Sequence, residues 1–186
     1  MKGRPLLEKA KNEDHGTPPE IWEAVSRVFQ GRPDIDPCGN PFALPSAGRA
    51  IWLPKWKGSL PPCYETHGVV EYGDGLEEQW HGTAYVNPPF HHKVLGRFME
   101  KAQHETWDGR CSAAIMLSPS KTGLKCWQAN VGFAAAVCFI GHRLTFLGNE
   151  DPALFDCALI LWTRDRTLRH RFALELDGTL GQVWTR

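Results

Sequence analysis

This sequence lacks several features that would by themselves assign a protein to a class. No apolar run is long enough to cross a membrane, and residues 1–13 mix Lys, Arg and Glu in place of the apolar core of a signal peptide. The formal net charge is zero, because 21 basic side chains balance 21 acidic ones, so contact with nucleic acid requires a local basic patch. We therefore expect a cytoplasmic protein that makes no contact with a membrane.

A metal site is not expected either. The six cysteines form no Cys-x-x-Cys pair, which is the spacing typical of structural zinc, and several lie among apolar residues, where a reduced cysteine packs as a small hydrophobic side chain. No carboxylate cluster typical of a metal-dependent nuclease stands out. The cysteines are Cys38, Cys63, Cys111, Cys126, Cys138 and Cys157.

The length and composition fit one globular domain. The chain has 186 residues, of which 42% are hydrophobic and 23% charged, and a chain of this size can bury a core. Residues 1–14 are polar and charged, which indicates a flexible N-terminal arm before a single domain over 15–186. Residues 41–66 are rich in Pro, Gly and Trp, so we expect an irregular insertion there, with one short strand at 50–53.

Apolar periodicity predicts strands that alternate with helices. Thr17-Pro18-Pro19-Glu20 has the form of a capping box and predicts a helix that is capped by Thr17 and ends at Gly31. The expected strands lie at 33–36, 83–86, 112–117, 134–140, 142–146 and 158–162, and further helices at 94–102 and 123–130. Alternation of this kind predicts an α/β fold, in which a mainly parallel sheet carries helices on both faces.

Two segments with chemical character follow predicted strands. They are Asp36-Pro37 and Asn87-Pro88-Pro89-Phe90. Ligands of open α/β sheets bind in the crevice at the carboxyl ends of the strands, so we expect these two segments to belong to one site.

The Asn87–Phe90 segment suits the binding of a planar amine. Two consecutive prolines fix their φ angles and remove two backbone donors, and a residue before proline is kept out of the helical region. The result is a stiff loop in which the Asn87 side-chain oxygen and the Pro88 carbonyl can both accept hydrogens from an NH₂ group, while the Phe90 ring can stack on a base. A simple Pro-Pro loop stop is the alternative, and a position directly after a buried strand favours the functional interpretation.

This loop resembles the catalytic motif of amino-methyltransferases that act on adenine or cytosine in DNA. Over about residues 16–163 the chain is similar to the small phage-type DNA adenine N6-methyltransferases, because a series of short segments occurs in the same order. These segments are Thr17-Pro18-Pro19-Glu20, Asp34-Ile35-Asp36-Pro37-Cys38, Asp74-Gly75-Leu76 with Trp80, Tyr85 to Phe90, Phe98 to Ala102, Leu117-Ser118-Pro119 and Gly141 to Phe146.

The resemblance implies a Rossmann-like methyltransferase fold that holds S-adenosylmethionine at the strand ends. It implies methyl transfer to the N6 amine of adenine in double-stranded DNA, inside a bacterial host cell if a phage or prophage encodes the chain. The catalytic residues would be Asn87, Pro88, Pro89 and Phe90. The residues near the cofactor would be Thr17, Pro18, Asp36, Pro37 and Cys38 on its methionine side, and Asp74 and Leu76 at its adenine ring.

Two features depart from the pattern of the family. Many methyltransferases have a glycine-rich loop after the first strand, whereas only Gly39 is present here, followed by Asn40 and Pro41. The acidic residue that usually holds the ribose is not obvious, and Glu65 and Glu71 are the candidates. Asp74 itself can be a turn residue, since it lies between two glycines.

Other polar residues are candidates for contact with the nucleic acid. We expect His91, Ser118 and Lys121 to lie on the substrate side, although residues 91–93 also fit a solvated helix start. A basic cluster near the C-terminus fits either a phosphate-binding patch or a solvated turn. Its members are Arg164, Arg166, Arg169, His170 and Arg171.

The sequence leaves the methyl acceptor open. Asn-Pro-Pro-aromatic loops serve planar amines in general, so cytosine N4, an RNA adenine and a protein glutamine amide are alternatives to adenine N6 in DNA. A different class is a non-catalytic nucleic-acid-binding protein that retains the fold. The intact Asn87–Phe90 segment favours an enzyme, and the chemistry needs neither a metal nor a covalent intermediate.

Overall fold

The computed structural model describes residues 16–40, 47–57 and 68–186. The predicted arm at 1–14 lies outside the described residues, as do 41–46 and 58–66 of the predicted insertion. The strands are β1 (Ile35–Gly39), β2 (Arg49–Trp52), β3 (Val69–Tyr72), β4 (Gly82–Val86), β5 (Cys111–Pro119), β6 (Ala136–Ile140), β7 (Cys157–Thr163) and β8 (Gly181–Thr185). The α-helices are α2 (Pro19–Phe29), α3 (His92–Trp107), α4 (Lys125–Asn130) and α5 (Arg166–Leu176), and two short 3₁₀ helices are η1 (Pro54–Trp56) and η3 (Val131–Phe133).

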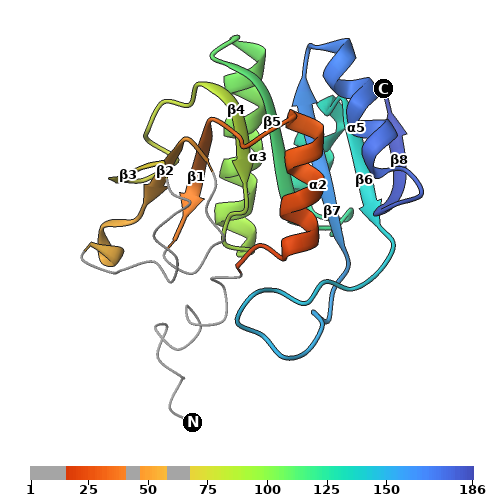
Figure 1. Cartoon of the computed structure of the whole chain (residues 1–186), viewed down its shortest axis with the longest axis horizontal. Helices are drawn as coiled ribbons and strands as arrows, with labels where there is room; N and C mark the ends of the chain where they lie inside the picture. Colours follow the sequence, from red (N-terminus) through yellow and green to blue (C-terminus); the bar gives the residue numbers. More distant parts are fainter. Residues whose placement is uncertain (1–15, 41–46, 58–67) are drawn as a thin grey trace.

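The strands of the described residues form one sheet in the order β3-β2-β1-β4-β5-β7-β6-β8. The neighbours from β3 to β5 are parallel, and β7 is antiparallel to both β5 and β6. Figure 1 shows this sheet with the helices packed beside it. The order 3-2-1-4-5 is that of a doubly wound, Rossmann-like sheet. The predicted α/β fold class is therefore confirmed.

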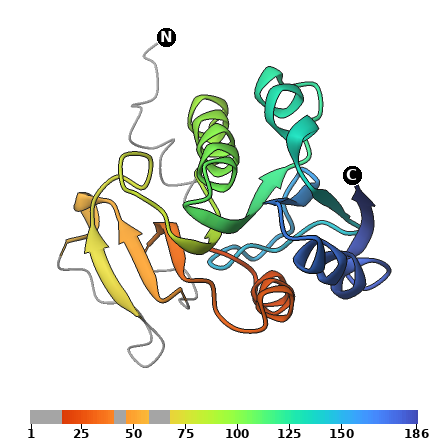
Figure 2. The same ribbon diagram turned by 90° about the horizontal axis from the view of Figure 1, so that it is seen from above.

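Helices cover both faces of the sheet, as the alternation predicted. Figure 2 shows α2 and α5 on one face and α3 and α4 on the other. Each face has its own buried cluster, and fully buried members include Val25 of α2 and Phe172 of α5 in one, and Leu95 and Met99 of α3 in the other. Burial of this apolar area, at about 25 cal/mol per Å², is the main force that fixes the layers.

The sheet reverses its strand order between β1 and β4. β1 pairs with β2 on one side and with β4 on the other, both in parallel. Asp34 fixes this junction at the amino end, where its carboxylate accepts hydrogen bonds from the backbone N–H and the hydroxyl of Thr83. The carboxyl ends of the two strands consequently lie side by side at the switch point, which is where such sheets bind ligands.

Two local predictions were wrong. Helix α2 starts at Pro19 after an N-cap at Pro18, and the Thr17 hydroxyl caps nothing, because it bonds side chains of the neighbouring strand instead. Residues 142–146 form no strand, although Leu144 and Phe146 are buried. β6 is already paired on both sides, by β7 and β8, so no free strand edge next to it was available to this segment.

The first strand is also displaced from its prediction. It was expected to end at Asp36, whereas β1 continues to Gly39 with an irregular register between Asp36 and Gly39. Such bulges re-aim side chains and often lie next to active sites. Within the part of the chain that the structure describes, no helix combines the length and apolar character needed to span a membrane.

Candidate functional site

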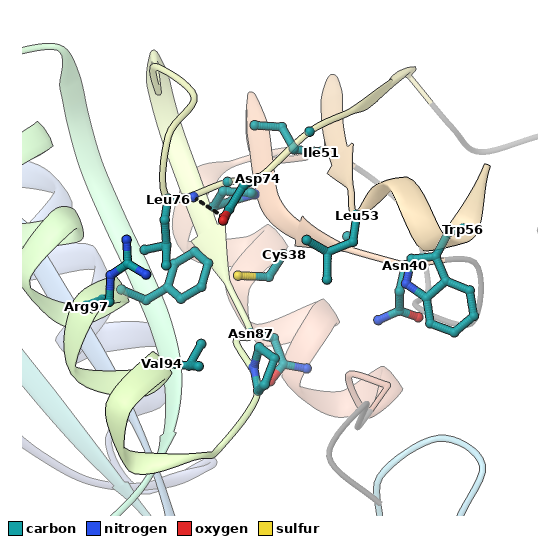
Figure 3. A pocket seen from close by; sticks show the side chains of 16 residues that line it. Cys38, Asn40, Ile51, Leu53, Trp56, Asp74, Leu76, Asn87, Val94 and Arg97 are labelled. Atoms are coloured by element: carbon teal, nitrogen blue, oxygen red, sulfur yellow. Dashed lines mark hydrogen bonds between the residues drawn. The ribbon is translucent and has the colours of Figure 1, made fainter. Parts of the chain in front are cut away.

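A cavity of about 250 Å³ lies at the carboxyl ends of β1 to β4, at the switch point of the sheet. Figure 3 shows its wall, with Asn40 and Trp56 at one end, Val94 and Arg97 at the other, and Cys38 between them. Apolar side chains form most of the lining, and a few polar groups interrupt it, which is the usual character of a small-molecule site. The lining residues are Pro37, Cys38, Gly39, Asn40, Ile51, Leu53, Trp56, Gly73, Asp74, Gly75, Leu76, Asn87, Pro89, Val94, Arg97 and Phe98.

The Asn87–Phe90 loop forms one wall of this cavity. It runs directly from the end of β4 to the start of α3, so a buried strand and a long helix hold both of its ends. Asn87 and Pro89 line the cavity, whereas Pro88 is buried behind them. The Asn87 amide nitrogen donates a hydrogen bond of 3.1 Å to the hydroxyl of Thr17. The structure thus brings the predicted catalytic loop beside Pro37, Cys38, Asp74 and Leu76 in one site.

The end of β1 forms the floor of the cavity. Pro37, Cys38 and Gly39 line it, while Asp36 lies beneath and accepts a hydrogen bond of 2.9 Å from the Cys38 backbone N–H. Burial raises the pKa of Asp36 to about 7, although this hydrogen bond acts in the opposite direction. Burial, followed by the charges of Asp36 and Asp74, raises the pKa of the Cys38 thiol well above its usual range. The floor therefore holds a carboxyl that can change its charge near neutral pH.

The segment after β3 closes another side of the cavity. The Asp74 carboxylate accepts a hydrogen bond of 2.9 Å from the Leu76 backbone N–H, so the predicted turn role is present, and the same residue also lines the cavity. A Cβ atom at Gly75 would lie only 1.9 Å from the Pro37 carbonyl oxygen, so only glycine permits this close approach to β1. The buried Trp80 indole donates to the Gly75 carbonyl at 2.8 Å and anchors the turn.

Thr17 and Pro18 lie behind the Asn87–Phe90 loop. Neither residue is among those that line the cavity, and both are buried. The Thr17 hydroxyl is 3.0 Å from the Tyr85 hydroxyl and accepts from Asn87. The hydrogen bond from Asn87 to Thr17 therefore connects the start of α2 to the wall of the cavity.

Phe90 lies at the other end of the loop, in an aromatic cluster with Phe146 and Phe155. Its ring centroid is 5.6 Å from that of Phe146 and 5.7 Å from that of Phe155, and both contacts are edge-to-face. The two partners belong to the segment 141–156, which in Figure 1 lies with the start of α2 at the same edge of the sheet as the cavity. Phe90 does not line the cavity, so its ring lies in a different region from the residues that are candidates for binding the cofactor.

The remaining predicted substrate residues are dispersed. His91 is the exposed N-cap position of α3. Ser118 is completely buried in β5, where its hydroxyl donates to the Pro119 carbonyl, and Lys121 is exposed beyond the end of that strand. None of the three lines the cavity.

The basic cluster lies away from this site. The Arg164 guanidinium lies 5.1 Å from the Trp107 ring centroid, Arg169 donates to the carbonyl of Arg186, and Arg171 donates to the carbonyl of Val28. Arg164 follows β7, and because β7 runs antiparallel to β5, its end lies at the opposite edge of the sheet from Asn87.

Several lining residues were not predicted from the sequence. Asn40, Trp56, Val94, Arg97 and Phe98 reach the cavity, and the sequence assigned none of them a role in binding. The helical spacing of Val94 and Phe98 predicted a buried face, and only the strand order shows that one end of this face meets the cavity. Arg97 carries an ion pair of 3.3 Å with Glu77 at the rim.

Of the two candidates for the ribose, Glu71 is described by the structure, and it does not line the cavity. Glu65 lies outside the described residues. Glu71 accepts a hydrogen bond of 2.6 Å from Arg49 on the far side of β2, and this bond lowers its pKa. Among the described residues, no group of three or more His, Cys, Asp or Glu side chains is arranged to hold a metal ion.

Comparisons with known proteins add a structural likeness to this geometry. No protein-family model matches the chain, and no curated protein matches it. Among solved structures, the chain is similar to a protein from Pyrococcus horikoshii described as a candidate RNA methyltransferase. The identity is 12% and the TM-score 0.45, over 85% of this chain and 96% of the other. A likeness at this level assigns neither an activity nor a substrate to this chain.

Proposed function

We propose that the protein transfers a methyl group from S-adenosylmethionine to the N6 amine of adenine in double-stranded DNA. The observation that carries this proposal is the position of the Asn87–Phe90 loop, which forms a wall of the cavity at the switch point. Amine methylation requires two adjacent sites, one that binds the amine and one that binds the nucleoside cofactor. A rigid loop beside a mostly apolar cavity fits this requirement.

The lining of the cavity fits the cofactor. Leu76, Val94 and Phe98 offer an apolar surface to an adenine ring, and Asp74 offers a carboxylate to its amine. The β1 end, with Asp36 below Pro37 and Cys38, would face the cationic methionine part. When bound, S-adenosylmethionine would supply an electrophilic sulfonium methyl group; its transfer to the adenine amine would break the bond from sulfur to methyl and release S-adenosylhomocysteine and one amine proton.

The loop would position the amine for this attack. The amide oxygen of Asn87 and the carbonyl of Pro88 accept the two amine hydrogens, which orients the nitrogen lone pair toward the methyl donor. The same acceptors stabilise the positive charge that develops on the nitrogen. In this structure the Asn87 oxygen is buried, so the loop must open slightly before a base can reach it.

The aromatic cluster would provide the place for the base. An adenine within a duplex has to flip out of the stack, at a cost of a few kcal/mol. Stacking on Phe90 would offset about 1–3 kcal/mol of this cost. The edge-to-face contacts of Phe90 with Phe146 and Phe155 are of the kind that an inserted base can replace.

Methyl transfer from tritiated S-adenosylmethionine to unmethylated duplex DNA tests the proposal. We expect incorporation at adenine, and we expect Asn87→Ala to lower kcat by about a hundredfold to a thousandfold, because an orienting acceptor is lost. Product binding, measured as a thermal shift with S-adenosylhomocysteine, should fall far less than kcat, because Asn87 is one of many residues that line the cavity. Gln182→Ala, which removes an exposed amide on the far edge strand β8, is the matched control and should retain full activity.

Three results would contradict the proposal. Absence of a thermal shift with either form of the cofactor would favour a non-catalytic binding protein. Incorporation into adenine-free duplexes or into RNA, with none into duplex adenine, would move the acceptor to cytosine or to RNA. Activity that survives Asn87→Ala would remove the catalytic assignment of the loop.

A further inference from the structure

A buried chain of hydrogen bonds connects the start of the first helix to the catalytic loop. The Asn87 amide nitrogen donates to the Thr17 hydroxyl at 3.1 Å, and the Thr17 and Tyr85 hydroxyls are 3.0 Å apart. Thr17 is 2% exposed and Tyr85 1%, so the bond between their hydroxyls is shielded from water, and the bond to Asn87 is partly buried. Both bonds join Thr17 to residues about seventy positions away, and neither supports secondary structure.

The direction of this chain determines which atom of the amide faces a substrate. An asparagine amide is nearly symmetrical in shape but offers an acceptor at one atom and two donors at the other. With the nitrogen held by Thr17, the oxygen is directed away from Thr17. A flipped amide would present an NH₂ group to the substrate amine, and two donors would then face each other.

Thr17 alone cannot fix this direction, because a hydroxyl both donates and accepts. If its hydrogen were available, it could donate to the Asn87 oxygen and so stabilise the flipped amide. A hydrogen bond from Thr17 to the Tyr85 oxygen would occupy that hydrogen and leave only lone pairs for Asn87. The ring of Tyr85 is itself held, inside β4 and edge-to-face against Trp22 with centroids 5.5 Å apart.

We propose that Thr17 is a positioning residue, which donates to Tyr85, accepts from Asn87 and thereby keeps the Asn87 oxygen in the acceptor orientation that methyl transfer needs. This inference rests on the proposed function. It also gives Thr17 a different role from the cofactor contact that the resemblance implies, since Thr17 acts here through Asn87 and not on the cofactor.

Thr17→Val and Thr17→Ser separate orientation from packing. Valine has nearly the same shape but lacks the hydroxyl, so we expect kcat to fall at least about tenfold while KM for S-adenosylmethionine stays within about twofold. Serine retains the hydroxyl and should recover most of kcat. Tyr85→Phe should also lower kcat, because Thr17 is then able to donate to the Asn87 oxygen.

Thr106→Val is the matched control for stability. Thr106 is also buried, at 7% exposed, and its hydroxyl donates to the Ala102 and Gln103 carbonyls in α3. This variant therefore loses a buried hydroxyl and its hydrogen bond, as Thr17→Val does, but away from the loop. We expect a similar fall in Tm for both, with kcat reduced only in Thr17→Val.

The side-chain amide signals of Asn87 in ¹⁵N-labelled protein test the contact without any activity. They are assigned by their loss in Asn87→Ala, and we expect slowed hydrogen exchange in the wild type that disappears in Thr17→Val. Unchanged amide signals in Thr17→Val, or an unchanged kcat, would overturn the proposal. A wild type that transfers no methyl group would overturn the proposed function, and the amide signals would then decide the positioning contact alone.

Discussion

The two ends of the Asn87–Phe90 loop are held by different forces. At the Asn87 end, two hydrogen bonds connect Thr17, before α2, to Tyr85 and Asn87 at the end of β4. At the Phe90 end, the ring packs edge-to-face against two other aromatic rings and against the apolar core. Hydrogen bonds fix direction, whereas apolar contacts are non-directional and can be exchanged for another flat surface. The comparison indicates that one end of the loop is built to orient a group and the other to exchange partners.

Phe90→Ala would remove the aromatic ring at the end of the loop where the apolar contacts can be exchanged. We expect kcat/KM for duplex DNA to fall about tenfold to a hundredfold, because about 1–3 kcal/mol of base stacking is lost. Binding of S-adenosylhomocysteine should remain within about twofold, since Phe90 does not line the cavity. Steady-state kinetics and a thermal shift with the product measure the two effects.

The control for this variant is Phe133→Ala. Phe133 is 55% exposed in η3 and does not line the cavity, so its removal should alter neither quantity. A Phe90→Ala protein that loses cofactor binding as severely as DNA turnover would mean that the two ends of the loop are not separate in function.

The sequence predicted the loop but not what holds it. Asn87-Pro88-Pro89-Phe90 is contiguous, and its stiffness follows from the prolines alone. The role of Thr17 was misassigned because its spacing to Glu20 fits a helix cap, and a local pattern of that kind does not reveal a partner seventy residues away. The contact became visible only when the strand order placed β4 beside the start of α2.

Alternation was similarly ambiguous in the segment 141–156. Leu144 and Phe146 are buried while Arg143 and Thr145 are exposed, which is the pattern of a strand with one covered face. Here the buried side chains pack against the core and, in the case of Phe146, against the ring of Phe90 without any strand pairing. Periodicity indicates which side chains are buried. Whether the segment forms a strand depends on what it packs against. The longer buried strands β5 and β7 were predicted well, because both of their faces are covered.

Asp36→Asn tests the Asn87 end of the loop, where burial above all, and to a smaller extent the charge of Asp36, raises the pKa of Tyr85. Burial raises the pKa of Asp36 from 3.8 to about 7, so the folded protein holds this proton more tightly than the unfolded chain does. The wild type should therefore lose stability relative to the variant as pH rises from about 4 to about 7, and the difference should be constant above that range. A difference of about three pKa units corresponds to about 4 kcal/mol, so we expect a difference in Tm on the order of 10 °C.

Melting curves of both proteins between about pH 4 and pH 8 provide the measurement. A difference in Tm that is independent of pH would show that Asp36 is ionised in the folded protein throughout this range. The orienting end would then hold a permanent negative charge, which would strengthen the binding of a cationic cofactor beside it.

We expect the smallest effect on DNA binding from a substitution in the basic cluster, which lies at neither end of the loop. The Arg164 guanidinium already lies over the Trp107 ring, at the edge of the sheet opposite Asn87. DNA whose base enters beside Phe90 would not reach it, whereas Lys93 is exposed only three residues after Phe90. Plots of log Kd against log salt should therefore keep their slope in Arg164→Ala and lose about one unit in Lys93→Ala. If the slope instead fell in Arg164→Ala and not in Lys93→Ala, the phosphate backbone would lie across the far edge of the sheet. A flipped base could not then reach Asn87.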